Sequence, residues 1–134
     1  MTAVAPSSQD ARLVLHLLDG VRLARNGAAV SGKAMQRRRL AIIVLLARAP
    51  GRVLARERLL GVLWPENSPE AGRRLLNEAV YILRKEFGPY VIRTQGEALA
   101  LDPELGCDVD DFLAAVAAKD WATAAAIYTG PFLG

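Results

Sequence analysis

Basic and hydrogen-bonding side chains are concentrated on one side of the segment from residue 68 to residue 87. At about 100° of rotation per helical residue, they follow one another around an arc that contains Arg73, Arg84, Asn77, Tyr81, Arg74 and Lys85. The adjoining sector is apolar and contains Leu76, Val80, Leu83 and Phe87. An apolar sector can pack on a core, while amide and guanidinium groups can form paired hydrogen bonds with base edges. The segment is therefore predicted to be an amphipathic helix whose polar face is suited to DNA.

Local chemistry marks both ends of this helix. Ser68 is a predicted N-cap, Pro69 fits the first helical position, and Glu70 favours the first turn. Gly88 and Pro89 then provide a stop. The helix is expected to cover residues 69–87.

The polar arc contains two kinds of candidate DNA contact. Because Asn77 lies at its centre, the predicted base contacts are Arg73, Asn77 and Tyr81. The predicted phosphate contacts are Arg74, Arg84 and Lys85. The alternative is a solvated helix face whose arginines pair with Glu70, Glu78 or Glu86, and the residues alone support both interpretations equally.

Two further segments carry candidate backbone contacts. Arg37 and Arg38 belong to a basic run in the first turns of another predicted helix, where one or two arginines can touch a phosphate. Arg93, Thr94 and Gln95 lie at or near the tip of a predicted hairpin, where Arg93 can reach a minor groove or a phosphate. The alternatives are a solvated charge run and an ordinary exposed turn. We expect the hairpin to contact DNA and the basic run to have at most a positioning role.

The charge distribution is uneven along the chain. Residues 1–101 carry 16 Lys and Arg against 8 Asp and Glu, whereas residues 102–134 carry 1 against 6. The basic part can attract a phosphate backbone or an anionic membrane surface, and an acidic tail is repelled by both. The longest apolar run, residues 40–47, is too short to cross a bilayer, and the N-terminus lacks the pattern of a secretory signal. We expect a cytoplasmic protein without a membrane partner.

Several classes of chemistry lack the residues they need. Cys107 is the only cysteine and His16 the only histidine, which excludes an internal disulfide and a multi-thiolate zinc site. The chain contains no nucleophile and base pair, glycine-rich phosphate loop or metal-ligand set. The acidic cluster at residues 108–111 is interpreted as a helix start rather than a cation site. We expect no enzymatic activity, no cofactor and no metal. Four aromatic residues are interpreted as packing residues: Trp64, Tyr90, Trp121 and Tyr128.

The remaining elements follow from periodicity and turn signals. Residues 1–11 are expected to be a disordered leader. Three strands are predicted at residues 13–18, 21–25 and 28–30, because Asp19-Gly20 and Asn26-Gly27 are tight-turn signals. The other predicted elements are a helix at 33–49 with Leu40, Ile43, Val44 and Ala47 inward, a short strand at 53–54, a helix at 56–63, a hairpin at 90–101, and helices at 109–118 and 121–128.

These elements predict an α+β fold. Two helices joined by a short loop, the second basic on its outer face, form a helix-turn-helix, and a following hairpin makes it winged. The predicted domain covers residues 12–102 and comprises an N-terminal three-stranded antiparallel sheet, three helices and the C-terminal hairpin. Residues 103–134 are predicted to be two further helices, which either pack on the first domain or begin a second domain of which this chain holds a fragment.

Four segments resemble the OmpR/PhoB-type winged helix of SARP-type bacterial transcriptional activators. PGRVLARERLLGVLWP at 50–65 resembles the connection into the second helix, and NEAVYILRKEFG at 77–88 resembles the recognition helix. VIRTQGEALALD at 91–102 resembles the wing, and CDVDDFLAAVAAKDWATAAAIYTGPFLG at 107–134 resembles the start of the bacterial transcriptional activator domain. The resemblance covers residues 13–134.

The resemblance implies a promoter-binding activator whose helix 69–87 enters the major groove while the wing contacts the flanking backbone or minor groove. It further implies double-stranded DNA with tandem direct repeats as a partner, contact with RNA polymerase through Glu66, Asn67 and Ser68, and downstream domains in a longer protein. Arg84 matches a basic residue near the backbone, and Arg93 belongs to the wing. The alternative function is a winged-helix protein-interaction module without DNA affinity.

The chain departs from the family pattern in three places. Ala55 stands where Ser or Thr usually caps the second helix, which removes that cap. The wing has Ala98 and Leu99 in place of the second Gly and the Tyr common in response regulators. About a dozen residues precede the first strand, so we expect no receiver domain before the winged helix and no control by its phosphorylation.

Overall fold

The computed structural model describes residues 13–18, 20–30, 32, 36–130 and 132. The chain divides into two compact units, which are described separately. Unit 1 consists of residues 1–30 and 104–134, and unit 2 consists of residues 31–103. The junction at 103–104 lies next to the predicted boundary, but the packing groups the N-terminal strands with the C-terminal helices. The predicted leader and residues 33–35 of the predicted first helix lie outside the described residues.

Unit 1 contains a four-stranded sheet in the order β3-β2-β1-β7. Its strands are β1 (Leu13–His16), β2 (Arg22–Arg25), β3 (Ala28–Ala29) and β7 (Gly106–Cys107). The first three are antiparallel, as predicted, and Asn26 and Gly27 both have the positive φ angles, 56° and 82°, that a two-residue hairpin turn favours. The fourth strand was not predicted: Val14 pairs in parallel with Gly106, and Leu15 with Cys107.

Among its described residues, unit 1 also contains two helices, namely α5 (Asp108–Ala117) and α6 (Trp121–Ile127). Asp108 is a buried charged residue at the start of α5. Its carboxylate accepts hydrogen bonds from the backbone N–H of Leu17 at 2.8 Å and of Leu18 at 3.0 Å. The first residue of the predicted acidic helix start therefore ties α5 to the end of β1.

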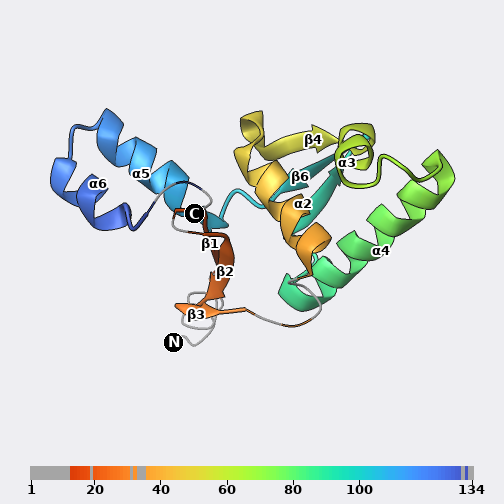
Figure 1. Ribbon diagram of the computed structural model, residues 1–134, viewed down its shortest axis with the longest axis horizontal. Helices are drawn as coiled ribbons and strands as arrows, with labels where there is room; N and C mark the ends of the chain where they lie inside the picture. The colour runs from red at the N-terminus through yellow and green to blue at the C-terminus, as the bar shows by residue number, and fades with distance from the viewer. Residues whose placement is uncertain (1–12, 19, 31, 33–35, 131, 133–134) are drawn as a thin grey trace. The chain divides into compact units, whose positions relative to one another are not determined.

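The described part of unit 2 contains three helices and a three-stranded sheet (Figure 1). The helices are α2 (Arg37–Arg48), α3 (Arg56–Leu63) and α4 (Pro69–Phe87), with a 3-10 turn, Pro50–Arg52, after α2. The strands are β4 (Val53–Ala55), β5 (Ile92–Gln95) and β6 (Ala98–Leu101), in the order β4-β6-β5. The hairpin therefore pairs with the short strand before α3 and forms one antiparallel sheet with it.

The buried face of α2 differs from the predicted one. Ile42, Ile43, Leu46 and Ala47 are buried, whereas the predicted inward residues Leu40 and Val44 are only half-buried. The eight residues from 40 to 47 are all apolar, so their periodicity cannot select one face. The orientation of α2 is set by its packing against α4 and β6.

The aromatic residues divide between core and surface. Trp64 is buried at the end of α3, as predicted. Tyr90 and Trp121 are 70% and 62% exposed, so the prediction that they are packing residues is wrong. Tyr128 is also exposed, but its ring packs against that of Phe112, with 5.9 Å between the ring centroids. Aromatic character indicates burial only in one direction, because a folded surface still displays much apolar area. Among the described residues, no helix combines the length and apolar character needed to span a membrane.

Candidate nucleic-acid interface

Helix α4 is held at both ends by the residues that predicted it. The Ser68 hydroxyl oxygen accepts a hydrogen bond from the Ala71 N–H at 3.2 Å, and Pro69 occupies the first turn. Gly88 follows the helix with φ of 104°, a conformation that glycine adopts without steric cost. The buried side is formed by Gly72, Leu76, Ala79, Val80 and Leu83. The opposite side of α4 is therefore free to carry the polar arc.

The start of α3 lies against the hairpin. Ala55 makes no side-chain cap, as expected from its missing hydroxyl. The N–H of Arg56 instead donates to the carbonyl oxygen of Glu97, in the hairpin turn, at 3.0 Å. A backbone acceptor from the hairpin therefore takes one of the otherwise free N–H groups at this helix end.

The three candidate base contacts are all exposed along α4. Asn77 and Arg73 already have partners: Asn77 Oδ1 accepts from Arg56 Nη1 at 3.0 Å, and Arg73 Nη1 lies 3.6 Å from Glu57 Oε1. Tyr81 is 63% exposed and borders a hollow of about 730 Å³ between α2 and α4.

Arg56 and Glu57 were missed by the sequence reasoning, which compared side chains within one helix. They are consecutive residues at the start of α3, and each contacts a different candidate on α4. The signal that could have found them is the helix-turn-helix itself, because it places the first turn of one helix beside the exposed face of the next. Arg73 has its ion pair with a residue of α3, and not with the α4 glutamates that the alternative interpretation considered.

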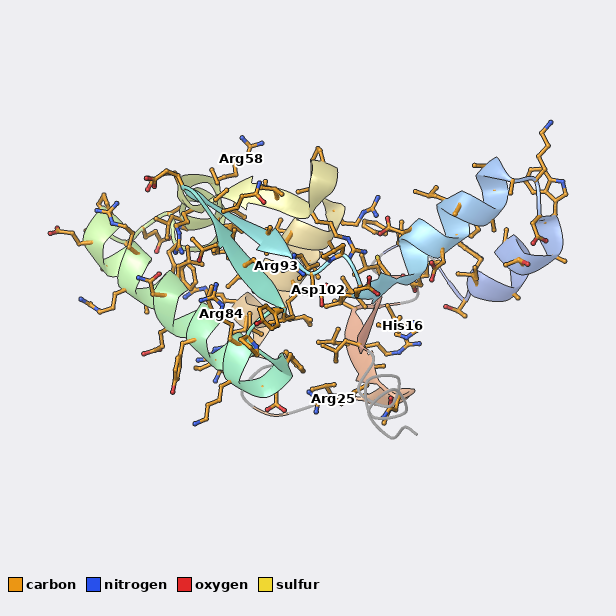
Figure 2. All side chains as sticks on the ribbon, turned by 180° about the vertical axis from the view of Figure 1, so that it is seen from behind. His16, Arg25, Arg58, Arg84, Arg93 and Asp102 are labelled. Atoms are coloured by element: carbon orange, nitrogen blue, oxygen red, sulfur yellow. The ribbon has the colours of Figure 1, made fainter. Side chains whose placement is uncertain are left out.

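The candidate phosphate contacts on α4 are not equivalent. Arg74 and Lys85 are exposed, while Arg84 is half-buried. Arg84 Nε donates to the Ile92 carbonyl oxygen at 2.8 Å, and its Nη2 donates to the Thr94 hydroxyl at 3.3 Å. Arg84 therefore connects α4 to the first strand of the hairpin, and Figure 2 shows its side chain between them. A phosphate contact by Arg84 stays a prediction.

The hairpin carries its candidates on β5. Arg93, Thr94 and Gln95 are exposed, and Gly96 has φ of 61° in the two-residue turn that follows. Arg93 Nη2 lies 3.8 Å from Asp102 Oδ1, and Figure 2 shows the two side chains facing each other. Thr94 also accepts the hydrogen bond from Arg84. Of the three wing candidates, Thr94 therefore contacts α4 directly.

The remaining candidates lie on α2 and in the loop after α3. Arg37 and Arg38 are exposed, and the Arg38 guanidinium carbon lies 5.9 Å from the centre of the Trp64 ring. That distance is within the range of a cation–π interaction. Glu66, Asn67 and Ser68 are exposed in the loop between α3 and α4.

Helix α3, a short loop, helix α4 with an exposed polar face and a following hairpin are the parts of a winged helix-turn-helix. Residues 32–97 match the family described as "Transcriptional regulatory protein, C terminal". This segment belongs to that family, the OmpR/PhoB-type winged helix, which confirms the resemblance found in the sequence. Residues 32–97 therefore carry the winged-helix DNA-binding domain of a transcriptional regulator.

Among solved structures, the chain is similar to Mycobacterium tuberculosis EmbR, determined in complex with a low-affinity phosphopeptide. The two share 23% sequence identity with a TM-score of 0.73, over 91% of this chain and 37% of the EmbR chain. The likeness shows the fold and confirms the predicted winged-helix architecture with mixed helices and sheets. This chain thus spans well under half the length of that relative. No curated protein matches the chain.

Proposed function

We propose that this chain is part of a sequence-specific transcriptional activator of the SARP type. In this proposal α4 lies in the major groove, and the hairpin contacts the flanking backbone or minor groove. The observation that carries it is the exposed row of Arg73, Asn77 and Tyr81 on the second helix of a winged helix-turn-helix. At 1.5 Å per residue the row is about 12 Å long, which matches about three or four stacked base pairs.

The charge of the two units supports this assignment. Unit 2 carries 13 Lys and Arg against 7 Asp and Glu, whereas unit 1 carries 4 against 7. Unit 2 is thus net positive and attracts a phosphate backbone, while unit 1 is net negative and is repelled by it. DNA binding by the chain is therefore assigned to unit 2, with Arg74 and Lys85 as its exposed phosphate contacts on α4.

The test is a pair of substitutions on α4 measured by fluorescence anisotropy with duplexes selected from a random pool. Arg74→Ala should weaken binding to all duplexes similarly and reduce the slope of log affinity against log salt by about one contact. Asn77→Ala should leave that slope unchanged and relax the preference for one base. Equal binding of the wild type and both variants to every duplex would contradict the assignment.

The proposed role also involves RNA polymerase and further domains of the same protein. We propose binding at tandem direct repeats, contact of Glu66 and Asn67 with RNA polymerase, and downstream domains in the full protein, which would act in the cytoplasm. Asn67→Ala should reduce transcription from a bound promoter in a purified system while the affinity for the promoter stays the same. A parallel loss of DNA affinity would argue against a polymerase contact.

A second candidate function is a protein-interaction module without DNA affinity. The observation that favours it is the set of exposed apolar side chains on unit 1: Leu113, Trp121, Tyr128 and Phe132. Salt-dependent binding to duplex DNA separates the two, because a pure protein-interaction module would show none.

A further inference from the structure

Arg56 makes hydrogen bonds with two other elements of unit 2, one through its backbone and one through its side chain. Its backbone N–H donates to the Glu97 carbonyl oxygen in the hairpin, and its Nη1 donates to Asn77 Oδ1 on α4. Both distances are 3.0 Å, and the residue is half-buried. A free arginine side chain would sample many rotamers, but here the hairpin holds the backbone of Arg56 and α4 holds its guanidinium group.

The chemistry of the guanidinium determines which end of the Asn77 amide faces it. Arginine has five N–H donors and no acceptor, so only the amide oxygen of Asn77 can bond to it. The Asn77 amide nitrogen keeps both of its N–H donors, and the oxygen keeps its second lone pair. A donor beside an acceptor is the pattern that an adenine edge requires, because N7 accepts and the N6 amino group donates.

We propose that Arg56 is a positioning residue of the DNA-binding surface, which holds the amide of Asn77 in the orientation that pairs with adenine. The inference rests on the proposed function of α4 and assigns its base preference in part to a residue of α3. Without Arg56, the amide can rotate and exchange its donor and acceptor ends. The neighbouring pair of Glu57 and Arg73 is longer, at 3.6 Å, and both side chains are more than half exposed. Such a pair orients its members weakly.

The test removes the donors of Arg56 and keeps its aliphatic stem. Arg56→Met should lower the preference for adenine over the other bases, at the position that Asn77→Ala also affects, by about fivefold or more. Arg56→Gln, which keeps a polar side chain but is too short to reach Asn77, is the second variant and should have the same effect. Base preference is measured by anisotropy with four duplexes that differ at that position, after circular dichroism has confirmed folding.

A double-substitution cycle separates positioning from direct contact. In the Asn77→Ala background, Arg56→Met should change the base preference no further, because Arg56 acts through Asn77. Arg58→Ala serves as the matched control, since Arg58 is an exposed arginine of the same helix, and it should leave the base preference intact. Figure 2 labels Arg58 on the opposite side of α3 from the labelled Arg84.

Three outcomes would overturn the inference. If Arg56→Met weakens binding to all four duplexes equally and reduces the salt slope, Arg56 is a phosphate contact. If Asn77→Ala relaxes base preference and neither Arg56 variant does, Asn77 acts without Arg56 while the proposed function stands. If the wild-type chain binds no duplex, the proposed function fails together with the inference.

Discussion

Two of the side chains on α4 that are candidates for base contact have partners in the free protein, and both partners come from the first turn of α3. Arg73 is paired with Glu57, and Asn77 is hydrogen-bonded to Arg56. An exposed ion pair is weak in water, while a hydrogen bond from a charged donor orients its acceptor. If Arg73 and Asn77 bind bases, Arg73 must leave Glu57, whereas Asn77 can keep its hydrogen bond with Arg56.

The pair of Glu57 and Arg73 predicts a gain of affinity when its acidic member is neutralised. Glu57→Gln should strengthen binding to every duplex by about two- to fivefold at low salt, because it releases Arg73 and removes a negative charge near the phosphates. Anisotropy at low and high salt measures this, and the gain should shrink at high salt. Asp111→Asn makes the same charge change at an exposed residue of unit 1 and should have little effect on DNA binding. A weaker complex for Glu57→Gln would contradict the prediction.

Asp120 predicts a pH dependence of helix α6. Its carboxylate accepts from the Thr123 hydroxyl at 2.7 Å and from the Thr123 N–H at 3.2 Å. The side-chain hydrogen bond first, and then the backbone one, lower the pKa of Asp120 below its ordinary value. Because the folded pKa is lowered, the stabilisation is present above the pKa of the unfolded chain and is lost as the pH falls through the folded pKa.

The measurement for Asp120 is a pH titration of the Thr123 amide resonance by NMR. The resonance should shift at a pH below the ordinary range of aspartate, as the cap is protonated. Asp120→Asn keeps an acceptor at the cap but does not titrate, so its Thr123 resonance should stay constant through the same range. A titration midpoint at or above the ordinary aspartate value would contradict the prediction.

The candidate site was predictable from the sequence to the extent that one helix determines it. The exposed arc of α4 and the Ser68 cap follow from periodicity and capping chemistry, and the structure contains both. The hydrogen bonds of Arg84 with Ile92 and Thr94 were not predictable, because they depend on how the hairpin folds back on α4. Contacts between elements require a tertiary arrangement that spacing within one segment does not contain.

At the scale of elements, the ends of the helices and strands were predicted better than their buried faces. Helices α3 and α4 have the predicted bounds, and the hairpin agrees within two residues. The buried face of α2 was wrong at Leu40 and Val44, because a continuous apolar run has no preferred side. The fourth strand of unit 1, β7, contains two residues, which is too short for an alternating pattern to be recognised.

Two glycines, Gly61 on α3 and Gly72 on α4, predict opposite tolerance to a methyl group. A Cβ at Gly61 would meet no atom within 4 Å, whereas a Cβ at Gly72 would lie 3.3 Å from Leu60 Cδ2. Gly61→Ala should raise the free energy of unfolding by about 0.5–1 kcal/mol through helix propensity. Gly72→Ala should give a smaller increase in the free energy of unfolding, or a decrease, because the Leu60 side chain must move to make room for the methyl group. Chemical denaturation of both variants measures the difference, and a larger gain at Gly72 would contradict the packing.

At the scale of the whole molecule, the chain forms two units that differ in charge and in the sequence separation of their contacts. Unit 2 is continuous, whereas unit 1 is assembled from both ends of the chain through β1, β7 and Asp108. The change in composition near residue 102 predicted a boundary there. The sequence did not predict that the C-terminal segment pairs with the first strand. That return depends on a pairing across about ninety residues, which local patterns do not contain.

Asp108 predicts a stability effect confined to unit 1. Asp108→Ala leaves the buried N–H groups of Leu17 and Leu18 without their acceptor, which costs about 2 kcal/mol or more. Hydrogen exchange of these two amides should therefore accelerate by about thirtyfold or more, while exchange at Ile43 in unit 2 should not change. Asp111→Ala, an exposed aspartate of the same helix turn, is the control and should have little effect. Equal acceleration in both units would show that they unfold together.

The parallel pairing of β1 with β7 also has a consequence for the order in which the protein forms on the ribosome. Strand β1 is synthesised early, but its neighbour β7 leaves the ribosome only after the whole of unit 2. Since domains generally fold as units during synthesis, unit 2 is expected to be complete while the edge of β1 is still unpaired. An open strand edge is a site of aggregation, so slow translation between residues 30 and 106 should lower the soluble yield.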